Sequence, residues 1–195
     1  MKKLIIIGIC LLCVPMVFGQ ASTLMSGDLE SGGFGGVFLH VSQLNGEMSI
    51  LTGWKGAWII NKTFCVGWSN TEQISDDNIA PIRLDGETGY LDISYRGLLL
   101  GLIIGSDRLV HFNVDAVVGW GSVDYKLKDS DDNWASDHFF VLTPELSVEI
   151  NVIPWMRIAV GAGYRLITEV QMEGVTGSDL SGFTGGLTLK FGKFS

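Results

Sequence analysis

Two rows of polar side chains have the residue types that catalysis or metal binding requires. His40 and Ser42 lie two positions apart, and a hydroxyl beside an imidazole base is the pairing that acyl transfer uses. His111, Asn113 and Asp115 repeat this spacing with side chains that could ligate a metal ion. Residues two apart share one face of a β-strand, so the polar face of any strand produces such rows. We therefore predict a structural role for both rows, with no catalytic and no metal site.

A third group of candidate ligands is a run of aspartates. Asp129, Asp131, Asp132 and Asp137 could bind a calcium ion, but the run lacks the glycine turn and the distal glutamate of a known calcium loop. A solvated acidic loop is the simpler interpretation. No glycine-rich phosphate loop follows a strand and opens a helix. The sequence thus predicts no cofactor and no enzyme.

The element that must position these side chains is a strand with one apolar and one polar face. From Val110 to Trp120 the even positions are apolar, while His111, Asn113 and Asp115 alternate with them. This is the period-two pattern of a β-strand. The pattern restarts often enough to predict eight strands, near residues 33–43, 47–60, 64–70, 89–104, 109–127, 138–152, 156–168 and 181–194.

The first residues indicate secretion. Lys2 and Lys3 precede an uncharged, mostly apolar run over 4–18, and small residues follow, which is the layout of a signal peptide. We predict a signal peptide over residues 1–19 and one domain over 20–195. Without the two lysines, 11 basic residues face 21 acidic ones, and this formal charge of −10 disfavours nucleic acid as a partner. Cys65 is the only cysteine left after cleavage, so no intrachain disulfide can form.

The connectors between the predicted strands alternate in length. Tight turns at 61–63, 105–108 and 153–155 contrast with longer, polar loops at 71–88, 128–137 and 169–180. A membrane barrel whose two ends face different compartments has this asymmetry, and it also carries aromatic bands at both interfaces. The candidate bands are Trp58, Phe64, Phe112, Trp155 and Phe191 toward the tight turns, and Trp68, Trp120, Phe140, Tyr164 and Phe183 toward the long loops. We therefore favour an all-β, eight-stranded antiparallel up-and-down transmembrane β-barrel over a soluble sandwich whose polar face meets water.

Ionisable side chains at mid-strand on the polar face would have to pair inside such a barrel, because an isolated buried charge is very costly. They are Lys55, Asp92, Arg96, His111, Asp115, Glu145, Glu149, Arg157, Arg165 and Lys190. Opposed residues of a hairpin point to the same side, so the length of the turn predicts which charges meet. A four-residue turn at 105–108 sets Arg96 diagonal to Asp115. A three-residue turn at 153–155 gives two further pairs in the lumen, which are Glu145 with Arg165 and Glu149 with Arg157.

Two features do not fit this register cleanly. Leu98, Leu100 and Leu102 fall on its inward face, which requires either an apolar lower lumen or a bulge at Gly97. Pro144 lies inside a predicted strand, where it removes a ladder hydrogen bond, so we expect a bulge there.

Across nearly all of the mature sequence, the chain resembles the small OmpA/OmpX-type eight-stranded outer-membrane barrels. The resemblance lies in the architecture and in the ending 187–195, where Leu187, Leu189 and Phe191 alternate, while Phe194 has the opposite parity. It implies that a barrel assembly machinery reads this ending. The segments 53–61 and 107–112 are also similar to a group of uncharacterised envelope proteins. The His-x-Ser spacing at residue 40 is similar to that of lipid A deacylases, which are small barrels with a hydrolytic site on the outer face.

The sequence therefore predicts a non-enzymatic envelope protein of the Gram-negative outer membrane, with a structural or surface-interaction role. Eight strands leave a lumen just wide enough for side chains, which disfavours a general diffusion pore. We expect a monomer whose partners are outer-membrane lipid, lipopolysaccharide and the assembly machinery, and the acidic loops could bind an extracellular ligand or protein. Two alternatives stay open, a secreted soluble β-barrel that binds an apolar ligand and a lipid A-modifying barrel enzyme.

Overall fold

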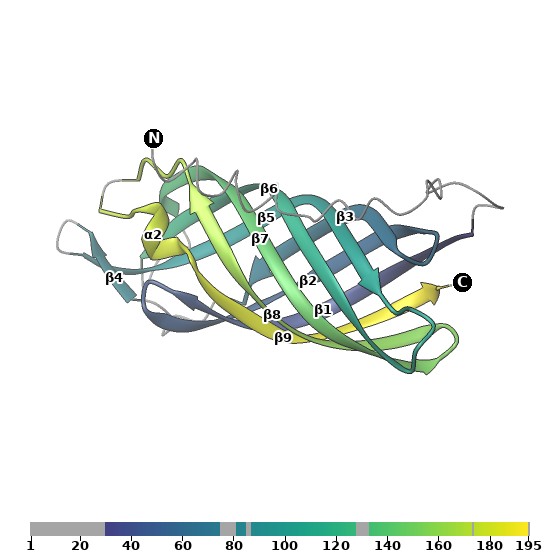
Figure 1. Cartoon of the computed structure of the whole chain (residues 1–195). Helices are drawn as coiled ribbons and strands as arrows, with labels where there is room; N and C mark the ends of the chain where they lie inside the picture. Colours follow the sequence, from purple (N-terminus) through teal and green to yellow (C-terminus); the bar gives the residue numbers. More distant parts are fainter. Residues whose placement is uncertain (1–29, 75–80, 85–86, 128–132, 173, 195) are drawn as a thin grey trace, which may run out of the picture.

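The strands join edge to edge into one antiparallel sheet that closes on itself (Figure 1). The computed structural model describes residues 30–74, 81–84, 87–127, 133–172 and 174–194. The elements are β1 (Ser31–Leu44), β2 (Glu47–Ile60), β3 (Phe64–Gln73), β4 (Pro81–Leu84), β5 (Glu87–Ile104), β6 (Val110–Leu127), β7 (Asn133–Ile153), β8 (Met156–Thr168), α2 (Gly177–Leu180) and β9 (Gly182–Lys193). The predicted signal peptide at 1–19 and the aspartates at 129, 131 and 132 lie outside the described residues.

Eight of the described strands form the wall of the barrel. β1 pairs with β2 and with β9, and pairing of β3 with β5 completes the circle. β4 has four residues and pairs only with β5, so it is an extension of the wall rather than part of it. The eight-stranded antiparallel barrel predicted from the sequence is thus confirmed. The bounds of the strands differ from the predicted ones by a few residues, most at β7, which begins at Asn133 rather than at 138.

The two ends of the barrel are built differently. At one end, which we call the turn end, β1 begins, β9 ends and the connectors β2–β3, β5–β6 and β7–β8 lie (Figure 1). The opposite end, the loop end, carries β4 and α2 (Figure 1). Its β1–β2 hairpin turns at Asn45 and Gly46, which both have positive φ, as the tight hairpin turn of an Asn-Gly pair requires. Within the described residues, no helix combines the length and the hydropathy that crossing a membrane requires.

Side chains alternate between the outside and the lumen along the eight strands of the wall. The outward positions are largely apolar and exposed, whereas the lumen holds two buried apolar clusters separated by polar side chains. The loop-end cluster includes Leu44, Leu51, Leu91, Ile93, Tyr95, Val123, Tyr125, Phe139, Val141, Ile167, Val175 and Leu180. The turn-end cluster consists of Phe34, Ala57, Ile59, Cys65, Leu99, Ile103, Val117 and Phe194.

The β7–β8 hairpin has the predicted register along most of its length. Glu145 pairs with Gly163, and Glu149 pairs with Ala159, as a three-residue turn requires. The turn itself is tighter, because Ile153 pairs with Met156 and the register shifts between 151 and 153. A bulge next to the turn therefore reconciles a shorter turn with the predicted pairing.

The β5–β6 hairpin does not have the predicted register. Ile104 pairs with Phe112 rather than with Leu109, and Asp115 pairs with Gly101. The connector is longer because its residues bind outside the hairpin: the Ser106 Oγ accepts a hydrogen bond from Arg157, and the Leu109 carbonyl accepts one from the Asn151 N–H. This change reverses the two faces of β5.

The reversal settles where the leucines of β5 lie. Leu98, Leu100 and Leu102 point outward and are exposed, and the pairing of β5 with β6 is continuous through Gly97, so neither the inward leucines nor the bulge at Gly97 is found. Asp92 and Arg96 have the same parity and also lie on the outer face. Their predicted place in the lumen is wrong.

Pro144 interrupts the ladder without a bulge. It pairs with Ala116 of β6, but Thr143 and Pro144 have no partners on β8. The pairing resumes at Glu145 in unchanged register. The missing N–H of proline thus leaves a gap between β7 and β8, and the predicted bulge at this position is wrong.

Candidate functional site: the charged lumen

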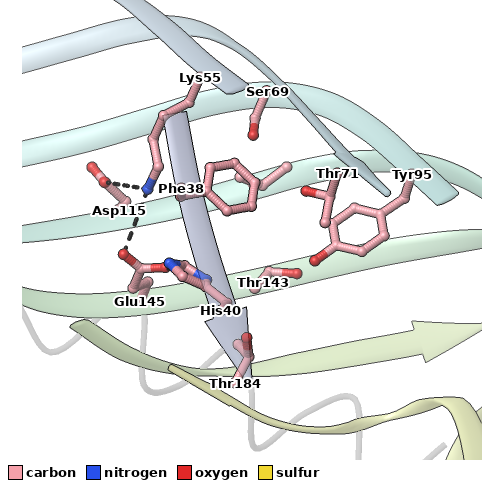
Figure 2. A pocket seen from close by; sticks show the side chains of 11 residues that line it. Phe38, His40, Lys55, Ser69, Thr71, Tyr95, Asp115, Thr143, Glu145 and Thr184 are labelled. Carbon is pink, nitrogen blue, oxygen red and sulfur yellow. Dashed lines mark hydrogen bonds and ion pairs between the residues drawn. The ribbon is translucent and has the colours of Figure 1, made fainter. Parts of the chain in front are cut away.

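The first group of lumen charges surrounds Lys55 (Figure 2). The Lys55 Nζ lies 3.7 Å from the Asp115 Oδ2 and 3.5 Å from the Glu145 Oε1. These side chains come from β2, β6 and β7, so the ammonium group crosses the lumen. The His40 Nδ1 of β1 lies 3.8 Å from the second oxygen of Glu145, and the Phe38 ring packs against Lys55 with its centroid 5.6 Å from the Nζ. Four strands are connected through this Lys55 cluster.

The second group surrounds Glu149 of β7, whose carboxylate is 1% exposed. The Glu149 Oε2 lies 3.2 Å from the His111 Nε2 and 3.7 Å from the Arg157 Nη1, while the Oε1 accepts a hydrogen bond from the Lys190 Nζ. The three partners come from β6, β8 and β9. The Arg157 guanidinium also lies 4.0 Å from the Phe194 ring centroid and closes over the lumen at the turn end. This Glu149 cluster gives a buried carboxylate the partners that it needs in a low-dielectric interior.

Arg165 of β8 is the largest fully buried side chain in the described part of the chain, and it is held differently. Its guanidinium donates to the Leu180 carbonyl at 3.0 Å, to the Gln43 carbonyl at 3.0 Å and to the Ser42 Oγ at 2.8 Å. These contacts connect α2 and the end of β1 to the wall. The Asn45 N–H also donates to the Asp179 carbonyl at 2.7 Å, so α2 is fixed inside the loop end by two strands.

A third ion cluster lies outside the lumen, at the turn end. The Lys62 Nζ lies 2.9 Å from the Glu30 Oε2 and 3.5 Å from the Asp107 Oδ1. All three side chains are in contact with solvent, in contrast to the lumen clusters. The hydrogen bond that Lys62 donates to Glu30 and the negative charge of Asp107 raise the pKa of Lys62 above its ordinary value. This rim cluster connects the start of β1 to two turns.

The structure brings together one of the three predicted charge pairs. Glu149 and Arg157 lie 3.7 Å apart. Arg96 cannot meet Asp115, because the reversed register of β5 points Arg96 outward and Asp115 pairs with Lys55. Glu145 and Arg165 stand in the predicted register, but Arg165 extends toward α2 while Glu145 meets Lys55 and His40. The Arg96–Asp115 and Glu145–Arg165 pairs are therefore wrong.

Three cluster members that sequence reasoning left without partners are Lys55, His111 and Lys190. Strand parity had placed all three inward. Their partners lie on β6 and β7, and only His111 has its partner, Glu149, on a neighbouring strand. The contacts of Lys55 and Lys190 cross the lumen between strands that are not neighbours, so a rule that pairs residues within one hairpin could not predict them.

The candidate catalytic pair His40 and Ser42 faces the lumen, and both side chains are buried. The Ser42 Oγ accepts from Arg165 and lies 3.2 Å from the Phe183 carbonyl, to which it donates. His40 contacts Glu145 rather than Ser42. A hydrolytic pair acting on membrane lipid would have to face outward, so the similarity to lipid A deacylases at these positions does not extend to their placement.

The row His111, Asn113 and Asp115 also faces the lumen, and each residue is buried. His111 and Asp115 belong to two different ion clusters. Across the described ranges, no group of three or more His, Cys, Asp or Glu side chains has the arrangement of a metal site.

The space left between the side chains is small. A cavity of about 20 Å³ lies beside the Lys55 cluster and has room for about one water molecule (Figure 2). Among its lining residues, His40, Thr143 and Thr184 each have a buried polar atom without a hydrogen-bond partner in the protein. The arrangement can hold strands together through charge pairs, and the cavity leaves room for a water molecule beside these polar atoms.

The comparisons with solved structures give the same architecture. The crystal structure of Neisserial surface protein A (NspA) superimposes with a TM-score of 0.57 at 14% identity, covering 85% of this chain and 97% of that one. Ail, the attachment invasion locus protein of Yersinia pestis, gives a TM-score of 0.48 at 12% identity over 83% of this chain and 97% of its own. The outer membrane protein OprG from Pseudomonas aeruginosa gives 0.47 at 15% identity over 83% and 95%. No protein-family model and no curated protein matches the sequence. The chain has the fold of the small eight-stranded outer-membrane barrels.

Proposed function

We propose that the protein is an integral outer-membrane β-barrel with a plugged, charged interior and a non-enzymatic structural or surface-interaction role in the cell envelope. The observation that carries this proposal is the distribution of side chains across the wall. Charged groups such as Lys55, Glu149 and Arg157 are buried in the lumen, while tryptophans and aliphatic side chains are exposed outside. A membrane barrel requires this arrangement.

The exposed apolar side chains of the outer face support a membrane location. The exposed aliphatic side chains include Val37, Leu39, Leu98, Leu100, Leu102, Val114, Leu146, Val148, Val160 and Leu187. Aromatic side chains flank them on the outer face, with Trp155 stacked on Phe191 toward the turn end and Tyr164 packed edge-on against Phe183 toward the loop end. A soluble barrel that binds an apolar ligand needs the opposite arrangement, an apolar lumen and a charged exterior.

The filled lumen supports a plugged barrel rather than a diffusion pore. The loop-end cluster closes one side of the polar clusters, and the turn-end cluster with Phe194 closes the other. The cavity between them has room for about one water molecule. We therefore propose a monomer whose interactions take place at its outer face and at its loops, with outer-membrane lipid and lipopolysaccharide around it.

Membrane fractionation tests the location. We expect the mature protein to sediment with outer membrane and to stay in the pellet after carbonate extraction, because the outer face is apolar. Recovery in the soluble fraction would contradict the proposal and favour a secreted barrel.

Cysteine labelling tests the orientation. In a Cys65→Ser background, Ser178→Cys at the loop end should react with an impermeant thiol reagent on intact cells. Asp107→Cys should react only after the envelope is opened. Asp107 suits this purpose better than the neighbouring Ser106, which is buried and bonded to Arg157. Equal labelling of both positions on intact cells would contradict the orientation.

The enzymatic alternative is tested at its only specific residues. Overexpression of the wild-type protein should leave the acyl chains of cellular lipid A unchanged in the mass spectrum, because His40 and Ser42 face the lumen. A shift in acyl-chain number that disappears in the His40→Ala, Ser42→Ala double variant would establish a lipid A-modifying enzyme instead.

A further inference from the structure

Arg96 is a cation on the outer face that has no partner in the part of the chain that the structure describes. It lies on β5 between Asn70 of β3 and Trp120 of β6, and it is exposed. Among the described residues, its guanidinium forms no ion pair and no hydrogen bond with another side chain. The charges of the lumen, by contrast, are all engaged. On β5, the wall therefore presents an unpartnered cation to its surroundings.

Arg96 lies at the loop-end border of the exposed apolar surface. The next outward residues toward the turn end are Leu98, Leu100 and Leu102, which belong to the exposed apolar surface. Arg96 is thus the first charged residue on the loop-end side of that surface, and the exposed Trp120 lies directly opposite. In a membrane, this is the depth at which hydrocarbon gives way to headgroups, and basic side chains there bind headgroup phosphates.

The surface around Arg96 is hollowed. A groove of about 380 Å³ lies across β3, β5 and β6, and its lining residues include Asn70, Glu72, Ser94, Trp120 and Ser122. The Asn70 Nδ2 donates to the Glu72 Oε1 at 2.9 Å, and the hydroxyls of Ser94 and Ser122 lie 3.2 Å apart. These contacts hold the polar groups in place without a ligand.

The mixture of groups defines the chemistry that fits. The guanidinium of Arg96 suits a phosphate, whereas the hydroxyls and the Glu72 carboxylate suit the hydroxyl and amide groups of a sugar. Glu72 would repel a headgroup that offers only a phosphate. Two other acidic residues, Asp92 and Asp124, pair with each other toward the loop end, and Asp92 lies about 13 Å from Arg96 along β5, at 3.3 Å per residue. Asp92 is already bound to Lys126.

We propose that this groove binds the phosphorylated sugar headgroup of lipid A, with Arg96 on a phosphate and with Glu72, Ser94 and Ser122 on the sugar. The inference rests on the proposed function, because it requires that the loop end lies in the outer leaflet. It adds a defined lipid site to a barrel that would otherwise only be embedded in lipid.

Native mass spectrometry of the purified barrel in detergent tests the site. The barrel is titrated with lipid A, with lipid A from which both phosphates have been removed, and with phosphatidylglycerol. We expect one lipid A molecule to stay bound to the wild type. Arg96→Gln should weaken its retention about tenfold or more, since hydrogen bonds to charged groups are among the strong ones. Dephosphorylated lipid A and phosphatidylglycerol should both bind more weakly than lipid A.

Arg108→Gln is the matched control, because Arg108 is an exposed arginine at the turn end and lies far along β5–β6 from the groove. Its retention of lipid A should equal that of the wild type. Equal retention by Arg96→Gln and wild type would overturn the site, and equal binding of phosphatidylglycerol would overturn the sugar component. A barrel that inserts into outer membrane yet shows no preference for lipid A refutes this inference alone. A protein that does not insert refutes the proposed function as well.

Discussion

Two ion clusters of this barrel use the same chemistry in opposite surroundings. In the Glu149 cluster, one carboxylate meets three side chains from three strands, and it is 1% exposed. In the rim cluster, one ammonium meets two carboxylates from separate segments, but Lys62 is 31% exposed and Asp107 is 83% exposed. When one partner of the rim cluster is removed by mutation, water can solvate the charges that remain. Neither Glu149 nor its partners can recover water, so the lumen cluster should be the more costly one to break.

The largest effect is expected in the lumen. Glu149→Ala leaves Arg157 and Lys190 buried without their shared carboxylate, and breaking a buried pair costs about 3 to 5 kcal/mol. The urea midpoint of the folded barrel in detergent should fall accordingly. Arg157→Ala should also lower the midpoint, and the double variant should lose much less than the sum because the two residues share an interaction.

Glu72→Ala is the control for this measurement, because Glu72 lies on the outer face and should change the unfolding free energy by less than about 0.5 kcal/mol. Small and additive effects of Glu149→Ala and Arg157→Ala, similar to that of Glu72→Ala, would mean that the lumen cluster is as well hydrated as the rim.

An intermediate effect is expected at Arg165, which is buried but bonded only to neutral oxygens. Arg165→Met keeps most of the side-chain volume and removes the donors to Leu180, Gln43 and Ser42. Because α2 lies at the mouth of the lumen, water can replace part of what is lost, so we expect a cost of about 2 kcal/mol.

Amide hydrogen exchange shows which part of the barrel the Arg165→Met variant destabilises. The amides of Asn45 and Ser181, which bond to Asp179 and Gly177, should exchange faster in Arg165→Met, while those of mid-barrel residues such as Val148 should not change. Unchanged exchange at Asn45 and Ser181 would show that Arg165 does not anchor α2, and that a buried cation can be as dispensable as one at the rim.

The wall of this barrel could be predicted from the sequence because alternation is a local signal. The predicted ranges 47–60 and 156–168 are also the observed ones. The β7–β8 register was predicted because the bulge next to its turn restores the pairing that a three-residue turn gives. The β5–β6 register was not, because Ser106 and Leu109 bind to β8 and β7, and this lengthens a connector that looks tight in the sequence.

The lumen clusters were less predictable than the wall for a related reason. Lys55 lies on β2 and Glu145 on β7, so their contact depends on how the closed sheet curves and tilts. Parity indicates that both side chains point inward, but it does not indicate which of the inward charges meet. Arg165 illustrates the same limit, because the carbonyls that it binds belong to a helix and a strand end rather than to the facing strand.

The smallest effect is expected at the rim, where the pKa of Lys62 gives a test with a defined sign. A lysine whose folded-state pKa lies above its ordinary value of 10.5 stabilises the fold fully below that pH, and the contribution disappears as the pH rises through the folded-state pKa. Lys62→Met should therefore lower the urea midpoint slightly and by a constant amount from neutral pH up to about pH 10.5. The difference from the wild type should shrink above that pH, and also in 1 M salt, where the Debye length is about 3 Å. The Glu149→Ala difference should persist in 1 M salt because its charges are shielded from solvent. A rim effect that stayed unchanged above pH 10.5, or that resisted salt as the lumen effect does, would mean that Lys62 contributes through packing rather than through its charge.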